Sequence, residues 1–273
     1  MNAWINGRRG TRIDHRDRGL QYGDGVFETM RVHGGRVRLL DYHLERFYAG
    51  LRRLEIAGPS PAALRAELER VVDRTSEGVL KLIVTRGSGR RGYRPTGSER
   101  CTRILTLHAL PRTVLEAGST PVRVRLCATP MGLNPALAGL KTLNRLESVL
   151  ARTEWRDARI WEGLMQDVDA NIVCGTMSNL FLRRRSTLTT PLLDRCGVAG
   201  VMRRWILETA GDLNLRAIER RVRWQDLNDA EEVFMSNAVV GLRSVAVIER
   251  GRERLHRAAF ETANRLRERL ESL

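Results

Sequence analysis

The first hundred residues alternate between amphipathic segments of helical period and short aliphatic runs. An apolar stripe at spacings of three and four predicts a helix carrying Leu44, Phe47, Leu51 and Leu54. Asp41 is placed to cap the start of this helix, and a Pro-containing turn at 58–61 is expected to begin a second helix. Residues 79–85 and 102–107 are rich in β-branched and aliphatic side chains, as buried strands are. This pattern predicts an N-terminal domain of mixed α/β type.

The rest of the chain predicts short strands followed by helices. Strands are expected at 122–128, 164–166, 172–173, 179–182 and 186–189. Gly200 precedes a helix with Val201, Trp205 and Ile206 inward, and another amphipathic run ends the chain. Pro111–Pro121 is the best candidate for a linker. We therefore expect an α/β (α+β) protein with an N-terminal domain at 1–115 and a C-terminal domain at 116–273.

The composition, 42% hydrophobic and 29% charged over 273 residues, is typical of a soluble globular protein. No apolar run approaches the roughly 20 residues that span a bilayer, and the N-terminal residues do not resemble a signal peptide. The four cysteines are widely spaced, without the pattern of a disulfide framework or a zinc site. These features predict a cytoplasmic protein without a metal site or a membrane partner.

The formal net charge of +15 raises the question of a nucleic-acid partner. The arginines are scattered along the whole chain, however, and aromatic residues make up only 5%. No recognisable DNA-binding motif or aromatic stacking platform is present. Compositional bias together with attraction of anionic small molecules accounts for the charge, and a noncatalytic basic nucleic-acid-binding protein is only a remote alternative.

Lysine is almost absent from this basic chain. Of the 47 basic residues only Lys81 and Lys141 are lysines, and an arginine guanidinium cannot form an imine. A lysine amine is the nucleophile that forms a Schiff base with an aldehyde cofactor or a carbonyl substrate. Lys141 lies in a loop ahead of an amphipathic run and is the candidate for imine formation. Lys81 lies within an expected strand, and a structural role is expected for it.

Three glycine-containing segments interrupt the core pattern. Residues 21–29 contain two glycines around Asp24, which indicates a tight turn or a close approach of the backbone. Residues 86–93 combine glycines with three arginines, so this segment either presents guanidinium groups to a carboxylate or forms a flexible solvated loop. Residues 197–203 lead into a helix start, where exposed N–H groups suit a phosphate.

Taken together, these segments resemble the class IV (fold-type IV) pyridoxal-phosphate enzymes. The resemblance is carried by Tyr22–Thr29, by Lys141 ahead of Asn144-Arg145, by Ser178-Asn179-Leu180-Phe181 and by Gly200-Val201-Met202-Arg203. It spans roughly residues 2–250 in order. It implies the D-amino-acid-aminotransferase-like fold, with a smaller N-terminal α/β domain and a larger, barrel-like C-terminal domain carrying the cofactor lysine.

The resemblance also implies how pyridoxal 5'-phosphate is held. Lys141 would be the catalytic lysine that binds the cofactor aldehyde and then moves the proton. Arg46 matches the arginine that binds the cofactor phosphate. The backbone amides of Val201 and Met202 match the phosphate-binding helix start, and Asn237 lies near the remaining phosphate contact.

The substrate side of the expected site is also implied by resemblance. Arg91 matches a position at which a related transaminase binds the substrate carboxylate, and Thr29 and Tyr93 are expected to line the substrate site. Residues 27–32, 80–93 and 134–141 are most similar to the family members that release pyruvate from 4-amino-4-deoxychorismate. A lyase that forms 4-aminobenzoate for folate synthesis is therefore expected, with a D-amino-acid or branched-chain aminotransferase as the alternative. The resemblance also implies a homodimer.

The chain departs from the family at Cys174, five residues before Asn179. The family usually has a glutamate there that pairs with the protonated pyridine nitrogen of the cofactor. A thiol cannot supply that charge-assisted hydrogen bond, which weakens the electron sink. Loss of pyruvate with aromatisation has its own driving force, so a lyase tolerates this change better than a transaminase does. Asp167 or Asp169 is an alternative partner for the nitrogen.

Overall fold

The structure is a computed structural model that describes residues 2–111, 114 and 120–272. Its contacts divide the chain into two compact units. The first unit comprises Met1–Leu115 and Leu140–Asn144, and the second comprises Glu116–Gly139 and Arg145–Leu273. The segment around Lys141 belongs to the first unit rather than to the unit that contains most of the C-terminal residues. Most of the expected linker, 112–113 and 115–119, lies outside the described residues.

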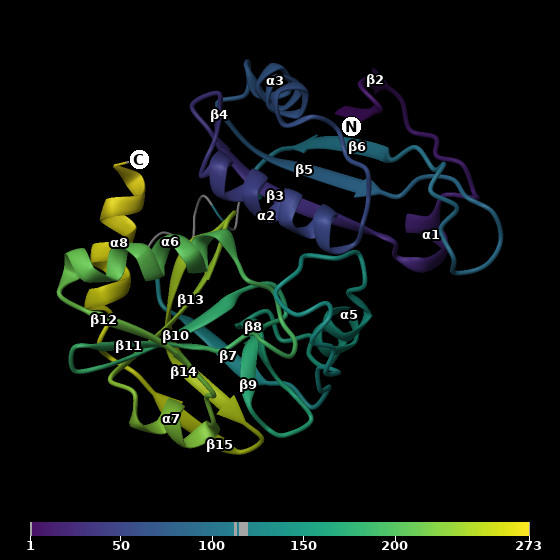
Figure 1. Cartoon of the computed structure of the whole chain (residues 1–273). Coiled ribbons are helices and arrows are strands. Elements are labelled where there is room, and N and C mark those ends of the chain that lie inside the picture. The colour runs from purple at the N-terminus through teal and green to yellow at the C-terminus, as the bar shows by residue number, and fades with distance from the viewer. Residues whose placement is uncertain (1, 112–113, 115–119, 273) are drawn as a thin grey trace. The chain divides into compact units, whose positions relative to one another are not determined.

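The first unit is built on a six-stranded sheet in the order β2-β1-β6-β5-β3-β4 (Figure 1). The strands are β1 (Asn2–Ile5), β2 (Arg8–Arg9), β3 (Gly25–His33), β4 (Arg36–Val37), β5 (Glu77–Thr85) and β6 (Thr102–His108). The helices are α1 (Arg18–Tyr22), α2 (Leu40–Arg53) and α3 (Pro61–Val72). The apolar side chains of α2 and α3 pack with alternate residues of β3 and β5, such as Met30 and Leu80, in one core.

The two long helices of this unit begin differently. Ser60 caps α3 by accepting a hydrogen bond from the amide of Ala63, and Pro61 occupies the first turn, as the sequence predicts. The expectation that Asp41 caps α2 is wrong. Leu39 precedes the helix in a left-handed conformation (φ 55°), and Asp41 lies inside the first turn. In the first turn, the negative charge of Asp41 still interacts favourably with the positive end of the helix dipole.

The second unit contains a nine-stranded sheet with β12-β11-β10-β13-β14-β7-β8-β9 in line and β15 paired to β14 (Figure 1). Its strands are β7 (Val122–Leu126), β8 (Ile160–Gln166), β9 (Ile172–Gly175), β10 (Asn179–Arg184), β11 (Thr187–Pro191), β12 (Arg216–Arg220), β13 (Glu232–Asn237), β14 (Gly241–Arg250) and β15 (Glu253–His256). Its helical segments are α5 (Leu146–Thr153), α6 (Val201–Thr209), η1 (Ala210–Leu213), α7 (Trp224–Asp229) and α8 (Glu261–Glu271). The two-unit α/β architecture that the sequence predicts is confirmed.

The amphipathic run that follows Lys141 forms a short helix that faces solvent. α5 begins at Leu146, and Leu143 belongs to the segment that pairs with β3. Leu146, Val149 and Leu150 are 76%, 55% and 57% exposed, so this amphipathic helix leaves its apolar stripe uncovered in the single chain. Such a stripe is typical of a surface that another molecule covers.

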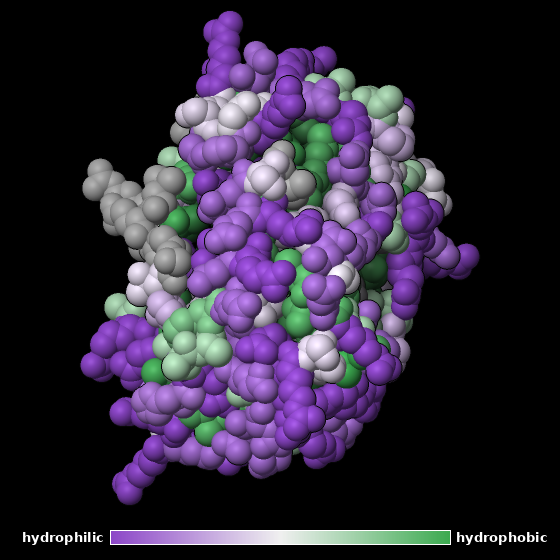
Figure 2. Space-filling view, turned by 90° about the vertical axis from the view of Figure 1, so that its left-hand side faces the viewer, coloured by the Kyte–Doolittle hydropathy of each residue, from purple (hydrophilic) through white to green (hydrophobic). Residues whose placement is uncertain are grey.

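The face that Figure 2 shows is mainly hydrophilic, with smaller hydrophobic areas between the hydrophilic residues. None of the helices in the described part of the chain has the length and apolar character that crossing a bilayer requires. Within those same residues, no group of three or more His, Cys, Asp or Glu side chains is arranged to hold a metal ion.

Candidate functional site

Lys141 lies on a short extended segment that continues the first unit's sheet beyond β3. The amide of Phe27 donates to the carbonyl of Lys141 at 3.0 Å, and the amide of Leu143 donates to the carbonyl of Gly25 at 3.1 Å. Antiparallel pairing puts the side chains of Phe27 and Lys141 on the same face. The Lys141 amine is accordingly 4.2 Å from the centre of the Phe27 ring. The ring therefore forms a wall against which this amine is positioned.

The glycines of segment 21–29 allow this pairing. Gly23 ends α1 with φ 68°, a left-handed conformation that favours glycine. A side chain at Gly25 would meet the backbone of Val84 and the side chain of Leu143. The segment thus contains the close backbone approach that its sequence indicates, and most of it is the start of β3.

Arg46, expected to bind the cofactor phosphate, lies in a buried charged cluster on α2. Its Nε donates to Glu28 Oε1 at 2.8 Å, and Glu28 Oε2 lies 2.6 Å from Nδ1 of His43. Burial alone would raise the pKa of Glu28, but the charge of Arg46 and the hydrogen bond with His43 outweigh it and lower that pKa to about 2. A charged Glu28 only accepts, so His43 Nδ1 carries the proton. This cluster fixes the position of the Arg46 guanidinium.

His43 contributes a second feature to this cluster. Its ring is buried, and burial lowers its pKa, so the neutral form is favoured at pH 7. With the proton on Nδ1, Nε2 carries a lone pair, and it has no hydrogen-bond partner among the described residues. No local sequence pattern marks Glu28 or His43 as site residues, because their pairing joins a strand to a helix 15 residues away.

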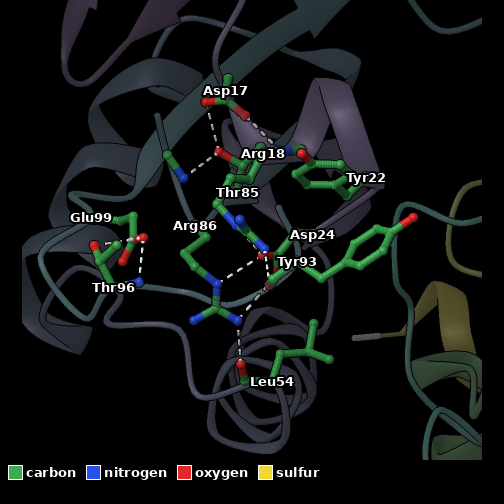
Figure 3. A network of polar contacts seen from close by, with 12 residues as sticks. Asp17, Arg18, Tyr22, Asp24, Leu54, Thr85, Arg86, Tyr93, Thr96 and Glu99 are labelled. Carbon is green, nitrogen blue, oxygen red and sulfur yellow. Dashed lines mark hydrogen bonds and ion pairs between the residues drawn. The ribbon is translucent and has the colours of Figure 1, made fainter. Parts of the chain in front are cut away.

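The arginine-rich loop after β5 is anchored by a second buried arginine (Figure 3). Arg18, only 3% exposed, donates to Asp24 Oδ2 at 2.9 Å and to the carbonyls of Gly92 and Tyr93 at 2.9 and 2.7 Å. Its guanidinium also lies 5.0 Å from the ring centre of Tyr22, which makes an edge contact with Tyr93. These contacts hold the middle of the loop against α1.

Arg86 points into the same network. It donates to Asp24 Oδ2 at 2.8 Å and to the carbonyls of Leu54 and Glu55, both at 2.7 Å. Its guanidinium is therefore committed to the protein, so Arg86 is not one of the guanidinium groups that this loop could present to a ligand. Arg91 lies on the exposed part of the loop, and Tyr93 is 83% exposed.

The second unit contains the helix start to which the resemblance assigns the cofactor phosphate. Gly200 precedes α6, no side chain caps this helix among the described residues, and Val201 and Met202 form its buried first turn. Asn179 supports this turn, because its Nδ2 donates to the carbonyl of Val198 at 2.9 Å and its side chain fills the space beside Gly200. The first-turn amides are thus available to an anion.

Asn237 lies near this helix start in the sheet. It ends β13, whose residue Ser236 pairs with Asn179 on β10. The Asn237 Oδ1 accepts from the amides of Val239 at 3.0 Å and Val240 at 2.8 Å, so its side chain stabilises the turn into β14. The structure brings Asn237, Val201 and Met202 to one region of the second unit.

Cys174 is buried on β9 among apolar and sulfur-containing side chains. Its Sγ is 3.7 Å from the sulfur of Met131, and burial raises its pKa to about 12, so the thiol is neutral at pH 7. Asp167 accepts hydrogen bonds from Asn171 and the adjacent backbone, and Asp169 forms an ion pair with Arg195. Both of these carboxylates are therefore already bound to protein groups in or near their own loop.

Glu162 is a residue that the sequence analysis missed. It is fully buried on β8 and accepts from the hydroxyls of Thr176 at 2.6 Å and Ser178 at 2.7 Å, as well as from the amide of Met177. This carboxylate fixes the turn between Cys174 and Asn179. Nothing in the local sequence marks it, because its partners follow 14 to 16 residues later.

Residues 25–248 match the family described as amino-transferase class IV, and the chain belongs to that family. An aminodeoxychorismate lyase of Vibrio harveyi is 34% identical over 246 residues, covering 90% of each chain. A crystal structure of 4-amino-4-deoxychorismate lyase from Pseudomonas aeruginosa has 43% identity and a TM-score of 0.91, covering 99% of this chain and 98% of that one. A hypothetical aminotransferase from Mycobacterium tuberculosis, solved in a PLP-bound form, has the same fold at 22% identity, with a TM-score of 0.83 and coverage of 96% and 93%.

Proposed function

We propose that this chain is a pyridoxal-phosphate-dependent lyase that converts 4-amino-4-deoxychorismate to 4-aminobenzoate and pyruvate, a step toward folate. The observation that carries this proposal is the amine of Lys141 beside the Phe27 ring, in a chain similar to aminodeoxychorismate lyases over nearly its whole length. The charge of +15, without a nucleic-acid-binding motif, suits a dicarboxylate substrate.

The residues present fit pyridoxal phosphate. Lys141 would supply the amine for its aldehyde, and we assign Arg46 and the first-turn amides of Val201 and Met202 to its phosphate, with Asn237 supporting the turn that follows β13. When bound, the cofactor supplies an electron sink for the substrate carbon that bears the amine. Cys174 is the residue that we assign to the pyridine nitrogen.

In this proposal, Lys141 is both the attachment point and the acid–base group. Its amine takes the proton from the ring carbon that carries the substrate's amino group. The carbon–oxygen bond to the enolpyruvyl group then breaks, the ring becomes aromatic, and the proton is returned to the methylene carbon that becomes the methyl group of pyruvate. Thr29, Arg91 and Tyr93 are the residues that we assign to the substrate side of the site.

The neutral thiol of Cys174 favours the lyase over a transaminase. A thiol with a pKa of about 12 carries no negative charge at pH 7 and cannot stabilise a protonated pyridine nitrogen as a carboxylate does. Transamination depends on that stabilised sink, whereas loss of pyruvate is also driven by aromatisation. The residue that departs from the family is therefore compatible with the reaction proposed.

We further propose a cytoplasmic homodimer that binds neither nucleic acid nor membranes. All four cysteines are free, which agrees with a reducing compartment. The exposed apolar stripe of Leu146, Val149 and Leu150 on α5 provides a surface that a second copy can cover.

Incubation of the purified holoprotein with 4-amino-4-deoxychorismate, scored for 4-aminobenzoate and pyruvate, tests this function. D-alanine and branched-chain amino acids with keto-acid acceptors are assayed beside it. Stoichiometric release of both products supports the lyase. Amino transfer without 4-aminobenzoate would identify a transaminase, and a colourless protein with salt-sensitive DNA binding would identify a basic binding protein.

A further inference from the structure

Glu162 and Glu232 are fully buried carboxylates on two strands of the second unit. Glu162 lies on β8 and Glu232 on β13 (Figure 1). A buried carboxylate is costly unless its oxygens accept hydrogen bonds, so the donors around it show which part of the fold it organises. Glu162 binds the turn between Cys174 and Asn179, whereas Glu232 binds the first turn of α8.

Glu162 accepts hydrogen bonds from its own strand and from this turn. Its Oε1 accepts from the amide of Gly163 at 2.9 Å and from the amide and the hydroxyl of Thr176 at 3.2 and 2.6 Å. Its Oε2 accepts from the amide of Met177 at 3.1 Å and from the hydroxyl of Ser178 at 2.7 Å. Each oxygen therefore accepts from at least one backbone N–H, which cannot reverse its direction as a hydroxyl can.

The turn that Glu162 binds connects two positions assigned to the cofactor site. A side chain at Gly175, directly after Cys174, would begin 2.8 Å from Glu162 Oε2, so the carboxylate packs against the backbone there. At the other end of the turn, Asn179 donates to the carbonyl of Val198 and supports the start of α6. The carboxylate thus lies between the residue assigned to the pyridine nitrogen and the side chain that supports the helix start assigned to the phosphate.

A neutral side chain of the same size cannot replace Glu162 in this place. A glutamine keeps one oxygen, but its NH2 group only donates hydrogen bonds. In one orientation of the amide, that NH2 group would face the N–H of Met177, and in the other it would face those of Gly163 and Thr176. Because two facing donors repel and the buried N–H loses its acceptor, the turn must move when the charge is removed.

We propose that Glu162 is a positioning residue for the cofactor. Through the turn, its charge sets the positions of Cys174 and Asn179, and with them the affinity for pyridoxal 5'-phosphate. This inference rests on the proposed pyridoxal-phosphate-dependent function. Because Glu162 acts through the turn, its loss should weaken binding of the cofactor and change the affinity of the loaded protein for its substrate little.

Glu232 provides the matched control. Its Oε1 accepts from the amide of Ala263 at 2.8 Å, and its Oε2 accepts from the amide of Thr262 at 3.0 Å and from Nε of Arg183 at 3.2 Å. A glutamine here would likewise direct its NH2 group at a backbone N–H in either orientation. Glu232→Gln should therefore destabilise the fold much as Glu162→Gln does, but the turn that it disturbs contains no residue assigned to the cofactor.

The test is equilibrium dialysis of the holoproteins of the parent, Glu162→Gln and Glu232→Gln against graded concentrations of pyridoxal 5'-phosphate. Glu162→Gln is expected to raise the dissociation constant of the cofactor about 10-fold to 100-fold, as the loss of a buried acceptor predicts. Glu232→Gln should change it less than about 3-fold, while thermal unfolding shows that both variants are destabilised. With saturating cofactor, KM for 4-amino-4-deoxychorismate should stay within about 3-fold of the parent value in both variants.

An unchanged dissociation constant in Glu162→Gln, or an equal loss in Glu232→Gln, would overturn the proposal, because Glu162 would then act only as a buried structural carboxylate. If Glu162→Gln does not fold, Ser178→Ala decides the question. It removes one donor to the carboxylate and must raise the constant at least about 3-fold, and an unchanged value contradicts the proposal. A parent that binds the cofactor but forms no 4-aminobenzoate refutes the lyase function and leaves the result for Glu162 intact. A parent that binds no pyridoxal 5'-phosphate refutes both.

Discussion

Replacing Glu28 with glutamine should lower the free energy of unfolding by about 3 kcal/mol at pH 7. The substitution keeps the size of a buried side chain but removes the charge that Arg46 and the His43 ring face. The folded protein lowers the pKa of Glu28 from 4.5 to about 2. Since one pKa unit corresponds to about 1.4 kcal/mol, the charged form contributes about 3 kcal/mol.

The dependence on pH has a definite sign. Because the pKa of Glu28 is lower in the folded protein than in the unfolded chain, its contribution is complete above about pH 5 and is lost as the pH falls toward 2. About 1 kcal/mol is lost by pH 4, so the difference between parent and variant should narrow from about 3 to about 2 kcal/mol. Burial also lowers the pKa of His43, so both proteins lose stability below about pH 6.5 as the unfolded chain takes up that proton.

Urea unfolding followed by circular dichroism at pH 7 and pH 4 measures these differences. Glu99→Gln is the matched control. The pKa of Glu99 is also lowered to about 2, by hydrogen bonds from the backbone of Thr96 and its neighbours, but this carboxylate lies on a surface loop outside the core. Glu99→Gln should leave the unfolding transition close to that of the parent. A Glu28→Gln variant within about 1 kcal/mol of the parent at pH 7, or a difference that widens in acid, would refute the reasoning.

Three further predictions concern the cofactor site, the loop and the proposed interface. Cys174→Glu should raise the ratio of transaminase to lyase rate about 10-fold, by restoring a charged partner for the pyridine nitrogen; unchanged rates for both reactions would contradict this. Arg18→Met should make trypsin cleave after Arg91 or its neighbours at least about 10-fold faster, because the loop loses its anchor; equal cleavage rates would show that Arg18 does not hold the loop. Leu150→Glu should convert a dimer to a monomer in size-exclusion chromatography, and an unchanged elution volume would exclude α5 from the interface.

The elements with local signals could be predicted from the sequence. Ser60 and Pro61 mark the start of α3, and Gly200 marks the start of α6. The start of α2 is predicted wrongly from Asp41. Asp41 is a good capping residue, but it lies two positions after Leu39, the left-handed residue that precedes α2. The start of β3 carries only the signal of a glycine turn, since Gly25 allows close packing against residues that follow much later in the chain.

The site shows the same distinction. Lys141 could be selected because lysine is nearly absent from the chain and its loop resembles a known family. The pairing of Glu28 with His43, the Glu162 hydrogen bonds and the place of the Lys81 amine beside the Phe27 ring could not be selected. Each depends on strand register or on helix–sheet packing, which no local pattern specifies. The roles of Arg91 and Tyr93 are still predictions.

The most direct test of the proposed chemistry is to locate the cofactor on the chain. The purified holoprotein is reduced with borohydride, digested and analysed by mass spectrometry, and Lys81 and Lys141 are the only lysines that can carry the label. We predict a pyridoxyl group on the peptide that contains Lys141, and its absence from Lys141→Ala. A label on Lys81, or no label on either lysine, would contradict the proposed mechanism.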